Sequence, residues 1–123
     1  MQDLAQMRCV PCRGGEPALS DAEIKHLLAQ LPGWQVIEVD GIKRIEKTFH
    51  FDNFAHALAF TDRVGALAEE QDHHPQLVTE WGQVKVAFWT HAVGGLHQND
   101  FIMAAKTEAA FAQAEGRKPS SLP

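Results

Sequence analysis

The stretch WQVIEVDGIKRIEKTF, residues 34–49, decides the fold. Its first half alternates between apolar and polar residues, as a strand with one buried face does. Asp40-Gly41 is a strong signal for a two-residue turn between antiparallel strands. Alternation resumes from Ile42 to Phe49, so the stretch predicts a β-hairpin.

Helical signals lie on both sides of this hairpin. Ser20 and Glu23 fit a capping box, in which the serine hydroxyl and the glutamate carboxylate accept from backbone N–H groups at a helix start. Apolar residues then recur at helical spacing until Pro32-Gly33 ends the helix. Residues 53–71 form the best-defined helix of the chain, because their apolar side chains follow one stripe. The members of that stripe are Phe54, Leu58, Thr61, Val64 and Ala68, widened by Phe60 and Leu67.

A second hairpin follows the long helix. Pro75 ends the helical region, and we expect two strands, over residues 76–81 and 84–91. Gly82-Gln83 is the predicted turn between them. Successive side chains of a strand point to opposite faces, so one face of the later strand meets the helices.

A last helix is predicted over residues 97–114, after the break at Gly94-Gly95. We expect it to bury Phe101, Ala105, Ala109 and Ala112. The order helix, two strands, helix, two strands, helix predicts an α+β fold in one domain. Its four-stranded antiparallel sheet has three helices packed on one face. The other face is left to solvent, a ligand or a partner subunit.

The two ends of the chain lack these patterns. Residues 1–18 contain prolines and glycines without sustained periodicity and are interpreted as a flexible N-terminal extension. Residues 116–123 are interpreted as a flexible tail, which leaves 19–115 as the folded domain. Cys9 and Cys12 form a Cys-x-x-Cys motif in the extension. We interpret them as two thiols of a flexible segment, with a local metal or redox role as the alternative.

The composition of the 123 residues limits the classes of function. The net charge is −5, and Lys and Arg occur singly or in adjacent pairs. Such a chain does not favour phosphate backbones, so direct nucleic-acid binding is not expected. No apolar stretch approaches the roughly 18 to 20 residues of a membrane span, and the first residues lack the order of a signal peptide. We therefore expect a cytoplasmic protein that does not enter a membrane.

The residues that can carry chemistry gather between positions 69 and 100. Glu69, His73, His74, His91 and Asp100 lie at or near the boundaries of predicted elements, where sites are usually assembled. Imidazole exchanges a proton near neutral pH and also binds metals. The adjacent side chains of His73 and His74 diverge, which disfavours two ligands of one metal. One of them with His91 and Asp100 could still hold zinc. A polar loop at a helix end is the plainer alternative.

These residues also carry a family resemblance. The pattern begins with an acidic residue, and His-His-Pro follows after three intervening positions. An aromatic residue follows the proline after five intervening positions, a histidine follows after nine more, and an aspartate after another eight. It is met by Glu69, His73-His74-Pro75, Trp81, His91 and Asp100. Over about residues 19–115 the chain resembles the pterin-4a-carbinolamine dehydratases, also called 4a-hydroxytetrahydrobiopterin dehydratases. The cysteine-bearing extension lies outside the common core of that family.

The resemblance implies a lyase that removes water from a 4a-hydroxytetrahydropterin to give the quinonoid dihydropterin. This step recycles the cofactor of aromatic amino acid hydroxylases. The resemblance implies no metal and no organic cofactor. The departing hydroxide needs a proton and a ring N–H loses one, which two imidazoles in different protonation states can accomplish.

The resemblance also assigns roles by position. His74 and His91 are the expected acid and base, in an order left open. His73 contacts the substrate or acts as the acid, and Asp100 orients a histidine. Trp81, beside the predicted turn, is interpreted as a packing residue.

Five further residues are candidates for binding the pterin. Glu69 could bond the guanidine-like edge of the pterin or a histidine, with a solvated carboxylate as the alternative. Trp34 could stack on the flat ring, with a core tryptophan as the equal alternative. Asp72, Trp89 and Thr90 are neighbours of the site in sequence.

A second kind of function stays open. Some members of the resembled family bind protein partners, so the alternative is a non-catalytic binding or dimerisation cofactor. A free sheet face and free edge strands favour association, and we expect a homo-oligomer, a dimer or a tetramer. An aromatic amino acid hydroxylase is the further partner that the resemblance suggests.

Overall fold

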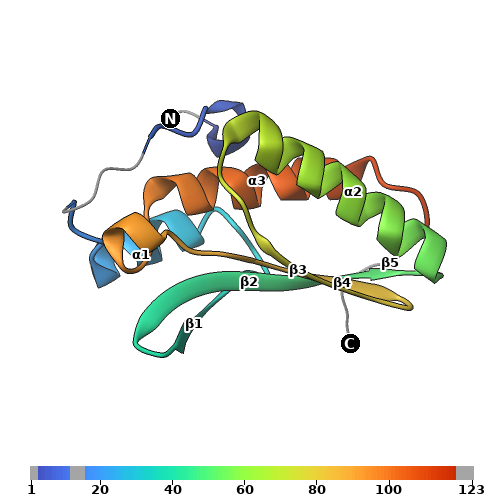
Figure 1. Ribbon diagram of the computed structural model, residues 1–123, viewed down its shortest axis with the longest axis horizontal. Coiled ribbons are helices and arrows are strands. Elements are labelled where there is room, and N and C mark those ends of the chain that lie inside the picture. Colours follow the sequence, from blue (N-terminus) through green and yellow to red (C-terminus); the bar gives the residue numbers. More distant parts are fainter. Residues whose placement is uncertain (1–2, 12–15, 119–123) are drawn as a thin grey trace.

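A computed structural model describes residues 3–11 and 16–118. The helices are η1 (Leu4–Gln6), α1 (Asp21–Leu28), α2 (Phe54–Gln71), η2 (His91–Val93) and α3 (Gln98–Ala112). The strands are β1 (Gln35–Val39), β2 (Ile42–Phe51), β3 (Gln76–Glu80), β4 (Gln83–Phe88) and β5 (Arg117–Lys118). The α-helices lie over one face of the antiparallel sheet, which confirms the predicted α+β fold (Figure 1).

The sheet has the strand order β1-β2-β4-β3, with the short β5 paired to β2. The β1–β2 turn is formed by Asp40 and Gly41, whose φ angles are 53° and 79°. Both values are positive, as the predicted two-residue turn requires. The second turn lies one residue earlier than predicted, because Gln83 already pairs with Glu80 in the strands.

An aromatic cluster fills the space between the sheet and the helices. Phe49 and Phe51 extend from β2 toward Phe60 of α2 and Phe111 of α3, with ring centroids 4.9 to 5.6 Å apart. Each such contact contributes about 0.5 to 1.5 kcal/mol beyond the burial of its area. The cluster therefore joins α2 and α3 to the central strand.

The predicted apolar stripe of α2 is partly wrong. Phe54 and Leu58 are each 44% exposed, whereas Ala57, Phe60 and Val64 are buried. Phe60, which widened the predicted stripe, lies on the buried face of the helix. A broad apolar pattern is compatible with two rotations of the helix about its axis that differ by about one residue, or 100°, so the pattern did not select between them.

The face of α3 was also only partly predicted. Phe101 and Ala105 are buried, but Ala109 and Ala112 are exposed and Ala110 is buried instead. Every residue from 99 to 105 is buried, so this helix has no clear apolar stripe in its first half. Alanine is common in helices on either face and marks the buried side weakly.

Described residues at both chain ends contact the folded domain. Leu4 is buried in the core, and the Lys106 ammonium donates to the carbonyl of Ala5 over 2.9 Å. Residues 3–11 thus pack against α3, because Leu4 supplies an apolar anchor. At the other end Arg117 pairs with Phe51 as the first residue of β5. Cys12 and residues 119–123 lie outside the described residues.

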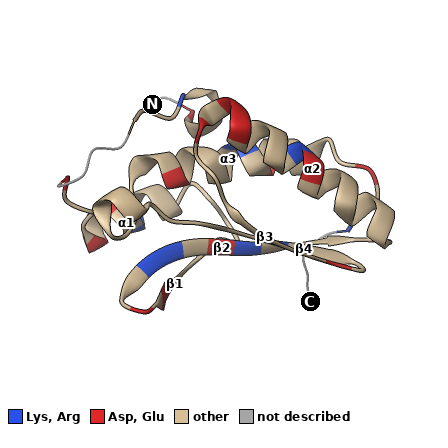
Figure 2. Ribbon diagram, in the orientation of Figure 1, with Lys and Arg blue, Asp and Glu red and all other residues tan. Residues whose placement is uncertain are grey.

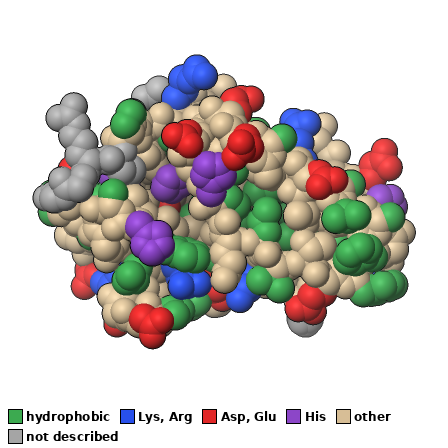
Figure 3. Space-filling model, viewed as in Figure 1, with side chains coloured by type: hydrophobic (Ala, Val, Ile, Leu, Met, Phe, Trp, Pro, Cys, Tyr) green, Lys and Arg blue, Asp and Glu red, His purple; other side chains and the backbone are tan. Residues whose placement is uncertain are grey.

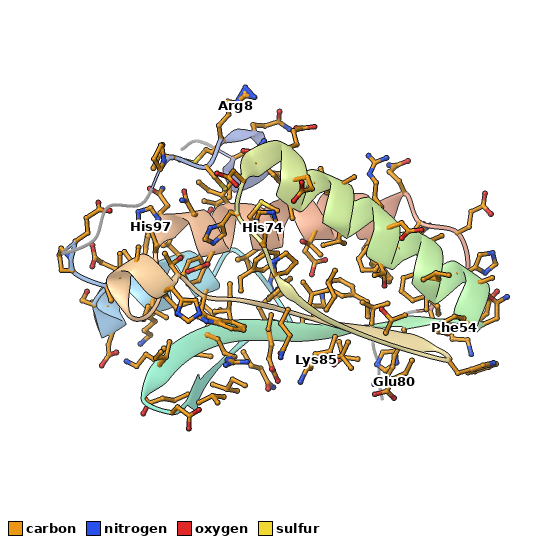
Figure 4. All side chains as sticks on the ribbon, viewed as in Figure 1. Arg8, Phe54, His74, Glu80, Lys85 and His97 are labelled. Carbon is orange, nitrogen blue, oxygen red and sulfur yellow. The ribbon has the colours of Figure 1, made fainter. Side chains whose placement is uncertain are left out.

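The face of the sheet without helices is polar. Glu46 of β2 pairs with Lys85 of β4, with Nζ and Oε1 3.9 Å apart, and the side chains of Lys85 and Glu80 extend away from the helices (Figure 4). Figure 2 shows basic residues on either side of an acidic one along β2. The Arg44 guanidinium lies 3.8 Å from the centre of the Trp89 ring on this side. In the described part of the chain, no helix is long and apolar enough to cross a membrane.

Candidate active site

A pocket of about 540 Å³ opens where the end of α2, the end of β4 and the start of α3 meet. Its volume lies within the range of small-molecule sites. The lining residues come from four segments of the chain: Cys9, Val10 and Pro11; Gln71, Asp72, His73 and His74; Trp89, Thr90 and His91; and Asn99.

The end of α2 separates the two adjacent histidines. Asp72 caps the helix in the left-handed conformation (φ 53°, ψ 43°), and the N–H of His73 returns to the carbonyl of Ala68 over 3.1 Å. The His73 side chain is 11% exposed and reaches α3, whereas the His74 side chain is 54% exposed and reaches back to Glu69. The adjacent imidazoles therefore diverge, as their sequence positions predicted.

Asp100 is fully buried and bonds to two residues that line the pocket, His73 and Thr90. Its Oδ1 is 2.6 Å from His73 Nε2, and its Oδ2 accepts from the Thr90 hydroxyl and from the backbone N–H of His97, each over 2.9 Å. The carboxylate occupies the first turn of α3, where the helix dipole favours negative charge. Its polar atoms are thus satisfied from three directions.

The bond to Asp100 determines the proton arrangement of His73. An ionised carboxylate accepts only, so His73 Nε2 carries a proton and donates it. In the neutral imidazole the other nitrogen, Nδ1, is then the acceptor. The ring is also held by stacking on Phe88, with centroids 6.4 Å apart and 12° between the planes. These contacts hold the His73 ring in position, and an ionised Asp100 favours the tautomer with the proton on Nε2.

His74 and Glu69 form a second, more exposed pair at the rim. His74 Nε2 lies 2.5 Å from Glu69 Oε2, and both side chains are more than half exposed. An exposed pair of this kind contributes little to stability. Figure 4 shows His74 beside the last turn of α2, and Figure 3 shows histidine and acidic side chains gathered on the same face.

The segment after β4 forms the opposite wall. The N–H of Thr90 donates to the carbonyl of Gly95 over 2.8 Å, which closes the loop that contains η2. Thr90 is buried beneath the pocket, while His91 is exposed at its edge. The ring of His91 meets that of Trp89 edge to face, with centroids 6.3 Å apart.

Most of the predicted site residues meet at this pocket. His73, His74, His91, Asp72, Trp89 and Thr90 line it, while Asp100 and Glu69 bond to two of its histidines. Trp34 lies elsewhere. It is buried against Phe49 and Phe88, and its Nε1–H donates to Glu108 over 2.8 Å, so it is a core tryptophan. Trp81 is 67% exposed at the β3–β4 turn, so its interpretation as a packing residue is wrong.

Five lining residues were not predicted. Gln71 and Asn99 adjoin the predicted residues Asp72 and Asp100, which is the one sequence signal for them. Cys9, Val10 and Pro11 carry no such signal, because their contacts to the pocket span a large part of the chain.

Two other histidines have structural partners. His97 Nδ1 accepts from the N–H of Asn99 over 2.9 Å and caps α3. His56 lies between the carboxylates of Asp52 and Glu115, at 2.5 and 3.8 Å. Among residues 3–11 and 16–118, no three His, Cys, Asp or Glu side chains are grouped as ligands for a metal ion.

Known proteins share this architecture and sequence. The sequence profile of the family described as pterin 4 alpha carbinolamine dehydratase matches residues 17–110. A relative from Nitrosococcus oceani, named provisionally as a pterin-4-alpha-carbinolamine dehydratase, is 53% identical over 108 residues, 88% of this chain and 96% of the relative. A protein of Chlorobium luteolum with the same provisional name is 50% identical over 111 residues, 90% of this chain and 97% of its own.

Two solved structures extend the comparison. A transcriptional coactivator/pterin dehydratase from Brucella melitensis has a TM-score of 0.69 and 34% identity, covering 76% of this chain and 97% of its own. A pterin dehydratase-like protein identified as a RuBisCO assembly factor in the alpha-carboxysome has a TM-score of 0.54 and 26% identity, covering 63% and 88%.

The fold and pocket define a small α+β domain with histidine–carboxylate pairs beside a cavity, an arrangement suited to moving protons. The sequence matches identify the lineage of that domain. The chain belongs to the pterin-4a-carbinolamine dehydratase family.

Proposed function

We propose that the chain catalyses the dehydration of a 4a-hydroxytetrahydropterin to the quinonoid dihydropterin. One observation carries this proposal: two imidazoles, His73 and His74, are each held through Nε2 by a carboxylate at one pocket, with a third, His91, on the opposite wall. Family membership supports dehydration as the reaction. In the pathway, this step would recycle the cofactor of an aromatic amino acid hydroxylase.

The reaction needs one proton given and one taken. The bond between C4a and the hydroxyl oxygen breaks, and the oxygen leaves as water after it receives a proton. The neighbouring ring N–H loses its proton, and its electron pair forms the new double bond to C4a. Each positioned acid or base contributes on the order of 10² to 10⁴ in rate.

We assign the acid and base to His74 and His91. Both side chains are accessible from the pocket, and they stand on its two sides. His73 is the least exposed of the three and is locked by Asp100 and Phe88, which suits contact with the substrate from a fixed position. Asp100 acts through His73.

The remaining candidates would hold the pterin. The carboxylates of Asp72 and Glu69 suit its guanidine-like edge, which offers N–H donors. Trp89 gives an aromatic surface for the ring. The Thr90 hydroxyl is already donated to Asp100, so Thr90 supports the site from below. Trp34 has no place in this proposal.

The test is a dehydration assay with 4a-hydroxytetrahydropterin generated in situ, against the rate in buffer. We expect turnover by the wild-type chain and a fall in kcat on the order of 10² or more for His74→Ala and His91→Ala. His26→Ala is the matched control, because His26 is exposed on α1, outside the pocket lining. A wild-type rate equal to that of buffer would exclude the enzymatic function.

A non-catalytic binding role is the second candidate. It is favoured by the two structural neighbours, of which one is described as a transcriptional coactivator/pterin dehydratase and the other as an assembly factor. Strands β1 and β3 form the two ends of the main strand order, and such edges can pair with another chain. We propose self-association into a dimer or tetramer, and a hydroxylase is a further candidate partner.

Two measurements separate this role from catalysis. Light scattering gives the oligomeric state, and a monomer at working concentration would contradict self-association. If binding were the sole function, His74→Ala and His91→Ala would leave complex formation unchanged and no dehydration would be seen with any variant.

A further inference from the structure

Residues 3–11 pack along α3, reach the pocket with their last three residues and are held at several points. Leu4 is buried in the core, and the Lys106 ammonium donates to the carbonyl of Ala5 over 2.9 Å. Further along, the N–H of Cys9 donates to Gln71 Oε1 over 2.9 Å. This segment, which we call the N-terminal strap, supplies three of the residues that line the pocket, Cys9, Val10 and Pro11.

Asn99 makes the most specific contact with the strap. Its Oδ1 accepts from the N–H of Val10 over 3.0 Å, and its Nδ2 donates to the carbonyl of Val10 over 2.6 Å. The side-chain amide thus pairs with one residue as a neighbouring β-strand would. Only asparagine and glutamine offer both an amide donor and a carbonyl acceptor in a side chain. Asn99 is 2% exposed, so its position is fixed by packing.

The strap differs chemically from the other walls. Val10 and Pro11 are exposed toward the pocket and offer apolar surface, whereas His73, His74 and His91 offer imidazoles. A ligand between these walls meets proton-transfer groups on one side and a largely apolar surface on the other. The position of the strap therefore sets the width of the pocket. The one ionisable side chain that the strap adds to the lining is the Cys9 thiol, which donates to the carbonyl of Asn99 over 3.8 Å.

We propose that Asn99 is a positioning residue that fixes the strap as a wall of the substrate pocket, and that it controls substrate affinity but not proton transfer. This inference rests on the proposed dehydratase function. Two adjacent residues at the start of α3 then have different roles: Asn99 holds the strap, and Asp100 holds His73.

The kinetic test breaks the contact from either side. Asn99→Ala removes the amide from α3, and Val10→Pro removes the backbone N–H together with the Val10 side chain from the strap. Both variants should raise KM by on the order of tenfold, because the binding-competent pocket becomes less populated, and should leave kcat within about twofold. Thr107→Ala is the control, since Thr107 is buried in the same helix but lines no part of the pocket. It should change neither parameter.

A purely structural role for Asn99 would give a different result. In that case Asn99→Ala and Thr107→Ala would both lower the fraction of folded protein and leave KM unchanged. A fall in kcat at unchanged KM would place Asn99 in the chemical step. Either result would overturn the proposal.

Amide hydrogen exchange provides a readout that does not need substrate. The N–H groups of Cys9 and Val10 should be protected in the wild type and exchange faster in Asn99→Ala, with Thr107→Ala like the wild type. Fast exchange at both in the wild type would show that the strap is not fixed and would overturn the proposal.

The two proposals can fail separately. Suppose that the wild type neither turns over the hydroxypterin nor binds 7,8-dihydropterin in calorimetry. The proposed dehydratase function is then excluded, and so is control of pterin affinity by Asn99, whatever amide hydrogen exchange shows for the strap. If the wild type is active but the KM of Asn99→Ala is unchanged while exchange is faster, only the inference about Asn99 fails.

Discussion

The hydroxyl of Thr90 donates to one oxygen of Asp100, which leaves the other oxygen to His73. The loop after β4 and the first turn of α3 thereby meet in one buried carboxylate. A hydroxyl donor at Oδ2 fixes the rotation of the carboxylate, so the orientation of His73 depends on a residue that the ligand need not touch.

The first prediction concerns the charge of Asp100. Asp100→Asn keeps the size of the side chain but replaces a pure acceptor by an amide that can donate to His73 and so favour the wrong tautomer. We expect kcat to fall on the order of 10² or more. Asp62→Asn, an exposed position on α2, is the control and should behave as the wild type. An unchanged kcat for Asp100→Asn would contradict the orienting role.

Removal of the Thr90 hydroxyl is the second prediction. Thr90→Val keeps the shape but leaves Asp100 Oδ2 with one donor fewer in a buried setting. We expect the free energy of unfolding to fall by about 1 to 3 kcal/mol, measured by urea denaturation. Thr48→Val, on the polar sheet face, should lower the free energy of unfolding by a smaller amount. Equal free energies of unfolding for the two variants would contradict a stabilising role of the buried hydrogen bond from Thr90 to Asp100.

Two glycines give opposite predictions for alanine. At Gly116 (φ 71°) a Cβ would overlap the ring of His56 and the carboxylate of Asp52, so the ion pair must separate. Gly116→Ala should lower the free energy of unfolding by about 1 to 3 kcal/mol.

Gly65 lies within α2 and a Cβ there meets open space, so Gly65→Ala should raise the free energy of unfolding by about 0.5 to 1 kcal/mol. Urea denaturation of both variants measures the contrast, and the same sign for both would contradict it.

The fourth prediction concerns pH and the start of α1. The backbone N–H of Ser20 donates to the Glu23 carboxylate over 2.8 Å and holds the pKa of Glu23 below its usual value. A lowered folded pKa adds stability above the unfolded pKa, and that stability is lost as pH falls through the folded pKa. Glu23→Gln should therefore be less stable than the wild type at pH 7, and the difference should close in acid. A difference that stays constant with pH would refute this.

The structural elements that were predicted correctly are those whose sequence signal is local. Asp40-Gly41 adopts the positive φ angles that its turn needs, and Ser20 with Glu23 forms the predicted capping box. In such cases residues a few positions apart carry the whole signal. The buried faces of α2 and α3 depended on packing partners, and there the apolar pattern allowed more than one answer.

The candidate site divides in the same way. His73, His74, His91 and Asp100 could be found from spacing and family resemblance, because their pattern lies within 28 residues. The contact of Asn99 with Val10 joins positions 89 residues apart, and no periodicity connects them. Trp34 was ambiguous because an aromatic ring suits a core and a ligand equally, and only its burial against Phe49 and Phe88 places it in the core.

The left-handed backbone at Asp72 has an evolutionary consequence. Glycine accepts this conformation freely, whereas a side chain there costs on the order of 1 kcal/mol. Selection for heat resistance alone would therefore drive position 72 toward glycine, while selection for a carboxylate at the pocket would retain aspartate. A survey of residue 72 among heat-adapted and ordinary relatives would record which pressure has prevailed.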